Sequence, residues 1–202
     1  TPGFLQCIKT ALAIKLKNAM GVNNIAVREK DIINYVMDEL AENDRVVMLE
    51  PHMRDRLAIV SFYVPNVHHN LVVRLLNDKF GVQTRGGCSC AGTYGHILLN
   101  VDEETSSKIT EKIDSGDLAE KPGWIRASFH PTMSNEEVTQ VVHAINEVTK
   151  HAHEWSKEYR FDPATGDFTH VSVEVQFPTL ASFDPLVVKE PSTPSLLKRL
   201  LG

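Results

Sequence analysis

The sequence predicts an α/β fold, a mixed and largely antiparallel sheet covered by helices, and three observations support this prediction. Two apolar, β-branched segments, at 45–50 and 57–64, each end at a proline, as strands often do. The segment 123–129 alternates apolar and polar residues, which is typical of a half-buried strand. Helical apolar spacing follows over 66–80 and again after residue 134. The order strand, strand, helix, strand, strand, helix indicates a small α/β sandwich.

Two helices are expected before the first strand. Apolar residues recur at helical spacing from Phe4 to Leu16, and the pattern ends near Gly21. A second helix is expected over 27–40, with charged residues on its wet side. Its buried stripe is predicted to comprise Ile32, Ile33, Val36, Met37 and Leu40. We interpret the two helices as a connector rather than as part of a core.

The sequence also marks the ends of the later elements. Asn66 is expected to cap the helix that runs to Phe80, and the segment 82–84 is expected to return as a strand. Residues 101–121 are polar with helical character and indicate an excursion over the surface. Ser134, with a glutamate three residues later, forms a capping box that opens the last helix.

This order of elements predicts three regions. Residues 1–44 are the helical connector, and 45–154 form the small α/β domain. Residues 155–202 are expected to form an irregular C-terminal extension, because the signal weakens there and the end of the chain is rich in proline and serine. An edge strand over 168–177 is a further option within that extension.

Composition excludes several classes of function. The net charge of −5 in 202 residues, with no basic stripe, argues against a general nucleic-acid binder. No apolar run reaches the length of about 18 residues needed to span a bilayer, so no membrane role is expected. Three cysteines, an odd number, do not make a disulfide framework. We therefore expect a reducing compartment, the cytoplasm or an organelle matrix.

The stretch 84–96 carries most of the candidate chemistry. It combines four glycines with two thiols, Cys88 and Cys90, between Arg85 and His96. A nearby fixed cation favours the thiolate form of a cysteine, so this loop suits a reactive cysteine. The alternative is a tight surface turn whose cysteines are merely small buried side chains.

Arg126 lies within the alternating strand, between neighbours that are expected to be buried. A buried guanidinium needs a partner, and a carboxylate is the natural bidentate one. That carboxylate belongs either to a substrate or to an acidic residue of the chain itself, as an internal salt bridge.

Three separated parts of the chain, at 1–3, 85–91 and 123–138, resemble one family. Residues 85–91 (RGGCSCA) resemble the R-x-G-x-x-C-A segment of cysteine desulfurases and selenocysteine lyases of the class V aminotransferase family. Residues 123–129 (GWIRASF) and 134–138 (SNEEV) resemble that family's R-x-S strand and the opening of its last helix. Residues 1–3 (TPG) resemble the end of its G-T-P segment. The resemblance covers about residues 1–150, in the expected order.

The resemblance implies a role for four residues. Cys90 matches the nucleophile that takes sulfur from a cysteine substrate as a persulfide. Arg126 matches the arginine that clamps the substrate α-carboxylate, and Arg85 the second arginine of that pocket. Thr1 matches the threonine that reaches the cofactor phosphate of the partner subunit in a homodimer.

The resemblance also implies the C-terminal small domain of a fold-type I enzyme that uses pyridoxal phosphate. The Schiff-base lysine and the rest of the cofactor site are expected in a large domain N-terminal to Thr1, because no lysine of this chain matches that lysine. Alone, the chain is therefore expected to be inactive and not to bind the cofactor. A sulfur-acceptor protein is a further expected partner.

Departures from the family pattern leave alternatives open. Cys88 and Ser89 stand where typical members carry two bulky residues before the nucleophile. The parent enzyme is then either a desulfurase or an aminotransferase or lyase in which Cys90 is structural. A third alternative is a non-enzymatic interaction module. Zinc at Cys88, Cys90 and His96 is disfavoured, because Cys-x-Cys is not the usual knuckle spacing, and no metal is assigned.

Overall fold

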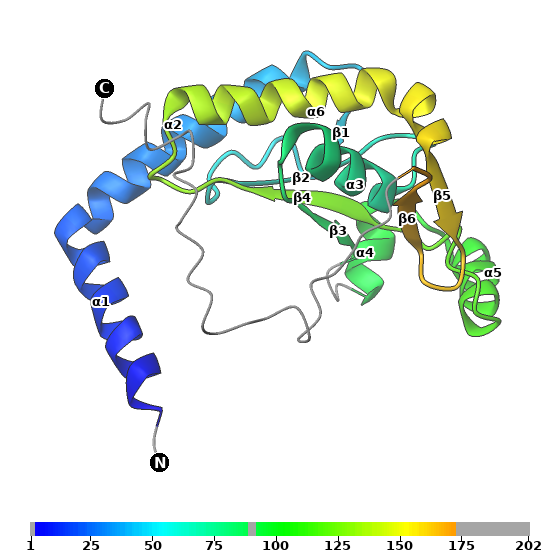
Figure 1. The fold of residues 1–202 in the computed structure, drawn as a ribbon, viewed down its shortest axis with the longest axis horizontal. Coiled ribbons are helices and arrows are strands. Elements are labelled where there is room, and N and C mark those ends of the chain that lie inside the picture. The colour runs from blue at the N-terminus through cyan, green and yellow to red at the C-terminus, as the bar shows by residue number, and fades with distance from the viewer. Residues whose placement is uncertain (1–2, 89–91, 173–202) are drawn as a thin grey trace, which may run out of the picture. The chain divides into compact units, whose positions relative to one another are not determined.

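A four-stranded antiparallel sheet lies at the centre of the computed structural model, which describes residues 3–88 and 92–172 (Figure 1). Its strands are β1 (Val47–Met48), β2 (Ile59–Tyr63), β3 (Arg85–Gly87) and β4 (Trp124–Ser128). They lie in the order β1-β2-β4-β3, which places β3 at an edge of the sheet. The predicted class, a largely antiparallel sheet covered by helices, is confirmed.

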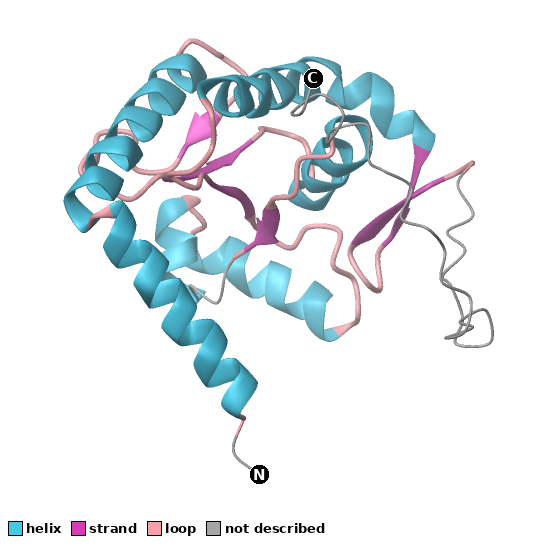
Figure 2. Ribbon diagram, turned by 60° about the vertical axis from the view of Figure 1, so that its left-hand side comes forward, coloured by secondary structure: helices cyan, strands magenta, loops and turns pink. Residues whose placement is uncertain are grey.

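Three helices pack on one face of this sheet: α2 (Val22–Ala41), α3 (His69–Phe80) and α6 (Asn135–Trp155). In Figure 2 the long helices run along one side of the strands. Side chains alternate across a strand, so Val60 and Phe62 of β2 point to this face together with Ile125 and Ala127 of β4. All four are buried and contribute to one core cluster.

The predicted stripe of α2 is buried, and it belongs to the same core cluster. Ile32, Ile33, Val36, Met37 and Leu40 are each at most 2% exposed. The second half of α2 therefore packs in the core, beyond the connecting role expected of it from the sequence. The helix also begins earlier than predicted, directly after Gly21, whose φ of 82° separates it from α1 (Phe4–Met20).

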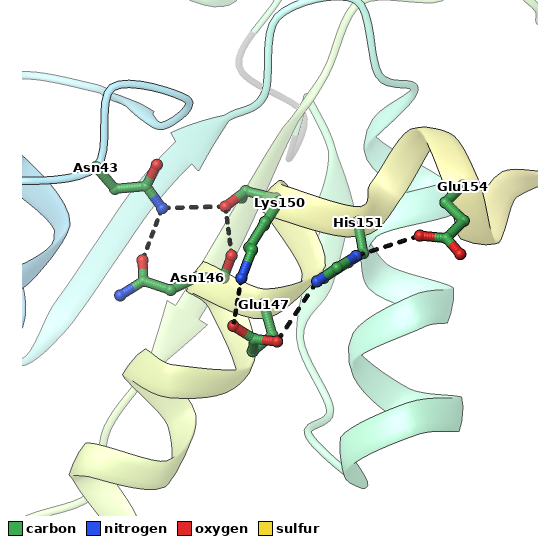
Figure 3. Close-up of polar contacts among 7 residues, drawn as sticks. Asn43, Asn146, Glu147, Lys150, His151 and Glu154 are labelled. Carbon is green, nitrogen blue, oxygen red and sulfur yellow. Dashed lines mark hydrogen bonds and ion pairs between the residues drawn. The ribbon is translucent and has the colours of Figure 1, made fainter.

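Figure 3 shows how the segment after α2 is tied to α6. Asn43 Nδ2 donates to Asn146 Oδ1 at 2.7 Å and to Thr149 Oγ1 at 3.0 Å. Thr149 is buried, and its hydroxyl also donates to the Asn146 carbonyl at 2.9 Å. A buried hydroxyl with partners on two segments fixes the approach of the chain to β1. Directly after Asn146 on α6, the carboxylate of Glu147 lies within ion-pair distance of Lys150 and His151.

The ends of two helices test the predicted caps. The capping box of α6 is confirmed: Glu137 N donates to Ser134 Oγ, and Ser134 N donates to the Glu137 carboxylate. The predicted cap of α3 is wrong. Asn66 takes a left-handed conformation with φ 61° in the preceding turn, and His68 is the N-cap, accepting from Asn70 N at 3.2 Å.

The strand expected over 82–84 is displaced. Those residues are irregular, and the strand is formed by Arg85–Gly87, which pairs with β4. The chain between β3 and β4 contains α4 (Gly92–Leu98) and, within the polar excursion, α5 (Glu103–Asp114). The helical character expected of residues 101–121 is thus confirmed, whereas α4 falls where a continuous loop was expected.

After α6 the described chain is more regular than the sequence indicates. A 3₁₀ turn, η1 (Ser156–Glu158), leads into a hairpin of β5 (Tyr159–Asp162) and β6 (Asp167–His170). The rings of Phe161 and Phe168 face each other across it at 4.8 Å. The hairpin belongs to the same compact unit as the sheet, and this unit extends to Val171. The edge strand considered for 168–177 extends past residue 172, beyond which the chain is not described.

The first helix, α1, has no buried residue. Phe4, Leu5, Ile8, Leu12 and Leu16 of its apolar pattern are all more than half exposed. Figure 1 shows α1 extending away from the helices that cover the sheet. Neither α1 nor any other described helix is both long enough and apolar enough to cross a membrane.

The core assignment predicts the effect of truncating Leu75 of α3. This side chain is 0% exposed, so Leu75→Ala should lower the free energy of unfolding by about 2–5 kcal/mol through lost burial and the cavity left behind. Leu57→Ala is the matched control, because Leu57 is 63% exposed and should change stability by no more than about 0.5 kcal/mol. Urea denaturation followed by circular dichroism measures both. Equal losses would contradict this core.

Candidate functional site

The face of the sheet opposite the helices carries two arginines side by side. Arg85 of β3 pairs directly with Arg126 of β4, and Ser61 of β2 pairs with Arg126 on its other side. Directly paired residues of neighbouring strands project to the same face, so these three residues form a row that we call the arginine face. Arg85 is exposed, and Arg126 is half-buried.

Arg126 has an unmet hydrogen-bonding need. Its Nε is buried and has no acceptor among the described residues. Among the described residues, no side chain forms an ion pair with Arg126 or with Arg85, so the internal salt bridge left open by the sequence finds no support there. Two guanidinium groups directly opposite each other repel, and a buried unpaired donor costs free energy. A carboxylate bound between them would relieve both penalties.

The two glycines of β3 serve different purposes, since Gly87 allows an unusual backbone conformation and Gly86 allows close packing. Gly87 has φ 106°, a conformation that other residues rarely adopt. Gly86 faces α3, where an added Cβ would lie 2.7 Å from Asn70 Oδ1 and 3.1 Å from His69 Cδ2. The N-terminus of α3 therefore approaches the sheet edge only because this position lacks a side chain.

Cys88 immediately follows β3, and its thiol is held in the protonated form. Its Sγ–H donates to the Pro122 carbonyl at 2.6 Å. Burial raises the pKa of the Cys88 thiol, and the nearby Lys121 charge opposes this rise only in part. A neutral, hydrogen-bonded thiol is a poor nucleophile. Cys88 therefore has the environment of a structural cysteine.

Two predicted site residues lie outside the described part of the chain, namely Cys90 and Thr1. His96, at the far end of the loop, lies on α4 and its Nδ1 contacts Ser106 Oγ at 3.3 Å. Among the residues that the structure describes, no three His, Cys, Asp or Glu side chains gather closely enough to hold a metal ion.

His69 is a site residue that the sequence motifs did not identify. It is only 7% exposed, and its ring stacks on His68 with centroids 4.4 Å apart. Burial lowers the pKa of His69 to about 4, with further lowering from the charges of His68 and Lys121. At Gly123 an added Cβ would lie 2.6 Å from the His69 ring. The glycines on both sides of this ring were the sequence signal for a close neighbour.

Comparisons with a family model and with known proteins match this chain to one family. Residues 1–141 match the model of the family described as Aminotransferase class-V. Over 147 residues the chain is 30% identical to a probable cysteine desulfurase of Halobacterium salinarum, and over 146 residues it is 29% identical to a cysteine desulfurase of Haloferax volcanii. The aligned segments cover 73% and 72% of this chain.

The chain spans only part of these relatives: the aligned segments cover 30% and 29% of their lengths. Among solved structures, it superposes on the cysteine desulfurase CsdA of Escherichia coli with a TM-score of 0.50 and 18% identity. That match covers 74% of this chain and 31% of the other. This structural likeness concerns the fold alone.

The low pKa of His69 predicts a pH-dependent stability. The unfolded chain takes up a proton near the ordinary pKa of 6.5, whereas folded His69 does so only near 4. The contribution is therefore complete above about pH 6.5, and it is lost as the pH falls towards 4. Over that range it should amount to about 3 kcal/mol.

Urea denaturation between pH 4 and pH 7 tests this prediction. His69→Phe should remove this part of the pH dependence, whereas the control His153→Phe, at an exposed position of α6, should retain it. Identical pH profiles for the wild type and His69→Phe would show that the imidazole does not make the predicted contribution.

Proposed function

Because the chain belongs to the class-V aminotransferase family, we propose that it is the part of a cysteine desulfurase that supplies the loop nucleophile and binds the substrate carboxylate. Cys90 is the proposed nucleophile, and Arg126 and Arg85 are the proposed carboxylate ligands. The remaining catalytic groups belong, in this proposal, to a large domain that holds pyridoxal phosphate.

The observation that carries the proposal is the pairing of Arg85 with Arg126 in neighbouring strands. Two adjacent cations with no acid from the described residues beside them form a receptor for a small anion. The buried, unpaired Nε of Arg126 specifies where one carboxylate oxygen should lie. The α-carboxylate of an amino-acid substrate meets this need.

Fixing the carboxylate orients the rest of the substrate. Pyridoxal phosphate, when bound, supplies the electron sink for chemistry at the substrate carbon. The Cys90 thiolate then attacks the substrate sulfur, so that a sulfur–sulfur bond forms as the carbon–sulfur bond breaks. The electron pair of the broken bond remains with the substrate carbon, and Cys90 carries the sulfur as a persulfide for transfer to an acceptor.

The environment of Cys88 supports the choice between the two loop cysteines. Its thiol has a raised pKa and is bonded to the Pro122 carbonyl, which disfavours the thiolate required for attack. The motif places Cys90, five residues after Arg85, at the nucleophile position. The assignment of the reaction to Cys90 thus rests on sequence, and the environment of Cys88 supports it.

The proposal extends to the organisation of the parent protein. Residues 1–44 connect to the large domain, with the second half of α2 packed in the core of the small domain formed by 45–154, and 155–202 are an extension whose first part, the β5–β6 hairpin, packs with that domain. The apolar side chains exposed along α1 support this arrangement, since a packed domain would cover them. We further propose a homodimer in which Thr1 contacts the cofactor phosphate of the partner, and a sulfur-acceptor protein in a reducing compartment.

Two cysteine variants of the complete enzyme test the proposed reaction. Cys90→Ala should abolish sulfur transfer to an acceptor while leaving the pyridoxal phosphate absorbance unchanged, because the thiol acts after cofactor binding. Cys88→Ala is the matched control and should retain most of the activity. Sulfide release and cofactor absorbance report the two properties separately.

If Cys88→Ala were the inactive variant, the motif would be misplaced by two residues. If both variants kept full desulfurase activity, a thiol nucleophile in this loop would be excluded. An enzyme with aminotransferase or lyase activity and no sulfur transfer would favour the alternative class of reaction.

A further inference from the structure

A pocket of about 440 Å³ lies at the edge of the sheet, beside the N-terminus of α3. Its walls come from α3, from β3 and Cys88, from the segment 118–121 and from the turn between β5 and β6. The size is within the range of pockets that hold small organic ligands. The family model ends at residue 141, so the wall formed by the β5–β6 turn lies beyond the matched region.

Hydrogen bonds fix the walls of this pocket to one another. Asn70 Nδ2 donates to the Gly166 carbonyl at 2.7 Å, joining α3 to the β5–β6 turn. Leu118 N donates to the Pro163 carbonyl at 2.8 Å, joining the segment before β4 to the same hairpin. The pocket is therefore preformed rather than dependent on a mobile flap.

The charges that line the pocket have one sign. Lys121 contributes a cationic group, and none of the described residues that line the pocket is an aspartate or a glutamate. This contrasts with the chain as a whole, whose net charge is −5. The N-terminus of α3, a helix of 12 residues, adds the positive end of its dipole.

His69 supplies an independent sign of a ligand. The residue is only 7% exposed, and it lines the pocket. Its ring forms no hydrogen bond with any described residue. Buried polar side chains normally have a partner. A ligand in the pocket would provide one for the imidazole.

We propose that this pocket binds a small organic anion, whose carboxylate or phosphate group contacts Lys121 at the positive end of α3 and whose remaining polar group pairs with His69. Gly87 and Cys88 line this pocket, so an occupant would influence the loop that begins at Cys88. The inference does not depend on the desulfurase reaction, since Lys121 and His69 have no part in the proposed chemistry.

Binding of two probe anions to the purified 202-residue chain tests the proposal. Malonate and inorganic phosphate are titrated by calorimetry at constant ionic strength set with chloride. Binding of malonate alone would assign the acidic group as a carboxylate, and binding of phosphate alone would assign it as a phosphate. Binding of neither probe would overturn the proposal.

Two variants establish that binding occurs in this pocket. Lys121→Gln should lower the affinity for the probe about tenfold, as expected for one lost charge-assisted hydrogen bond. Lys157→Gln, in η1 and outside the pocket, makes the same change in net charge and should leave the affinity unchanged. Equal affinities for the two variants would overturn the proposal.

The imidazole of His69 provides a second readout. Its ring signals in a nuclear magnetic resonance spectrum, assigned by their loss in His69→Phe, should shift on saturation with the probe. Saturation without a shift would place the anion elsewhere and would contradict the proposed contact.

Discussion

The register between β3 and β4 is the constraint on which both sites depend. With Arg85 opposite Arg126, two cations share one face of the sheet, and Gly86 is left on the other face beneath the N-terminus of α3. A slip of one residue would turn every side chain of β3 to the opposite face. Arg85 would then point at His69, and the position facing Arg126 would carry a glycine.

The hydrophobic core stabilises that register although it contains none of the chemistry. Ile125 and Ala127 of β4 point into the core, which forces Arg126, between them, onto the opposite face. The apolar alternation of one strand thus determines where its one arginine lies. Repulsion between Arg85 and Arg126 weakens the pairing of β3 with β4. This pairing involves only a three-residue strand at the edge of the sheet. In functional sites such local conflicts are common.

Much of the fold was predictable because its signals are local and strong. The stripe of α2, the capping box of α6 and the alternation of β4 each depend on residues within one element. The displaced strand at Arg85–Gly87 was not predictable from propensity, since two of its three residues are glycines. Pairing with β4 overrides that propensity. The hairpin after Trp155 was missed for a related reason, because its two strands have four residues each and stabilise each other by pairing.

The candidate site likewise contains residues that the sequence predicted and one that it did not. The arginine and cysteine positions followed from motifs that can be read in the sequence, and the structure adds that the two arginines are cross-strand neighbours. His69 was missed because a histidine at the start of a helix is ordinarily solvated. Its burial depends on Gly86 and Gly123, which are distant from it in sequence and remove the side chains that would otherwise exclude the ring.

The central claim is that Arg126, with Arg85 beside it, recognises the α-carboxylate of the substrate. Its most direct test is to measure the dissociation constants of cysteine and of cysteamine, which lacks the carboxylate, in the complete enzyme with Cys90→Ala preventing turnover. Adding Arg126→Ala should weaken the binding of cysteine by about 2–5 kcal/mol, because a desolvated charge loses its partner. The affinity for cysteamine should be nearly unchanged. Equal weakening of both ligands, or no weakening of cysteine, would contradict the account.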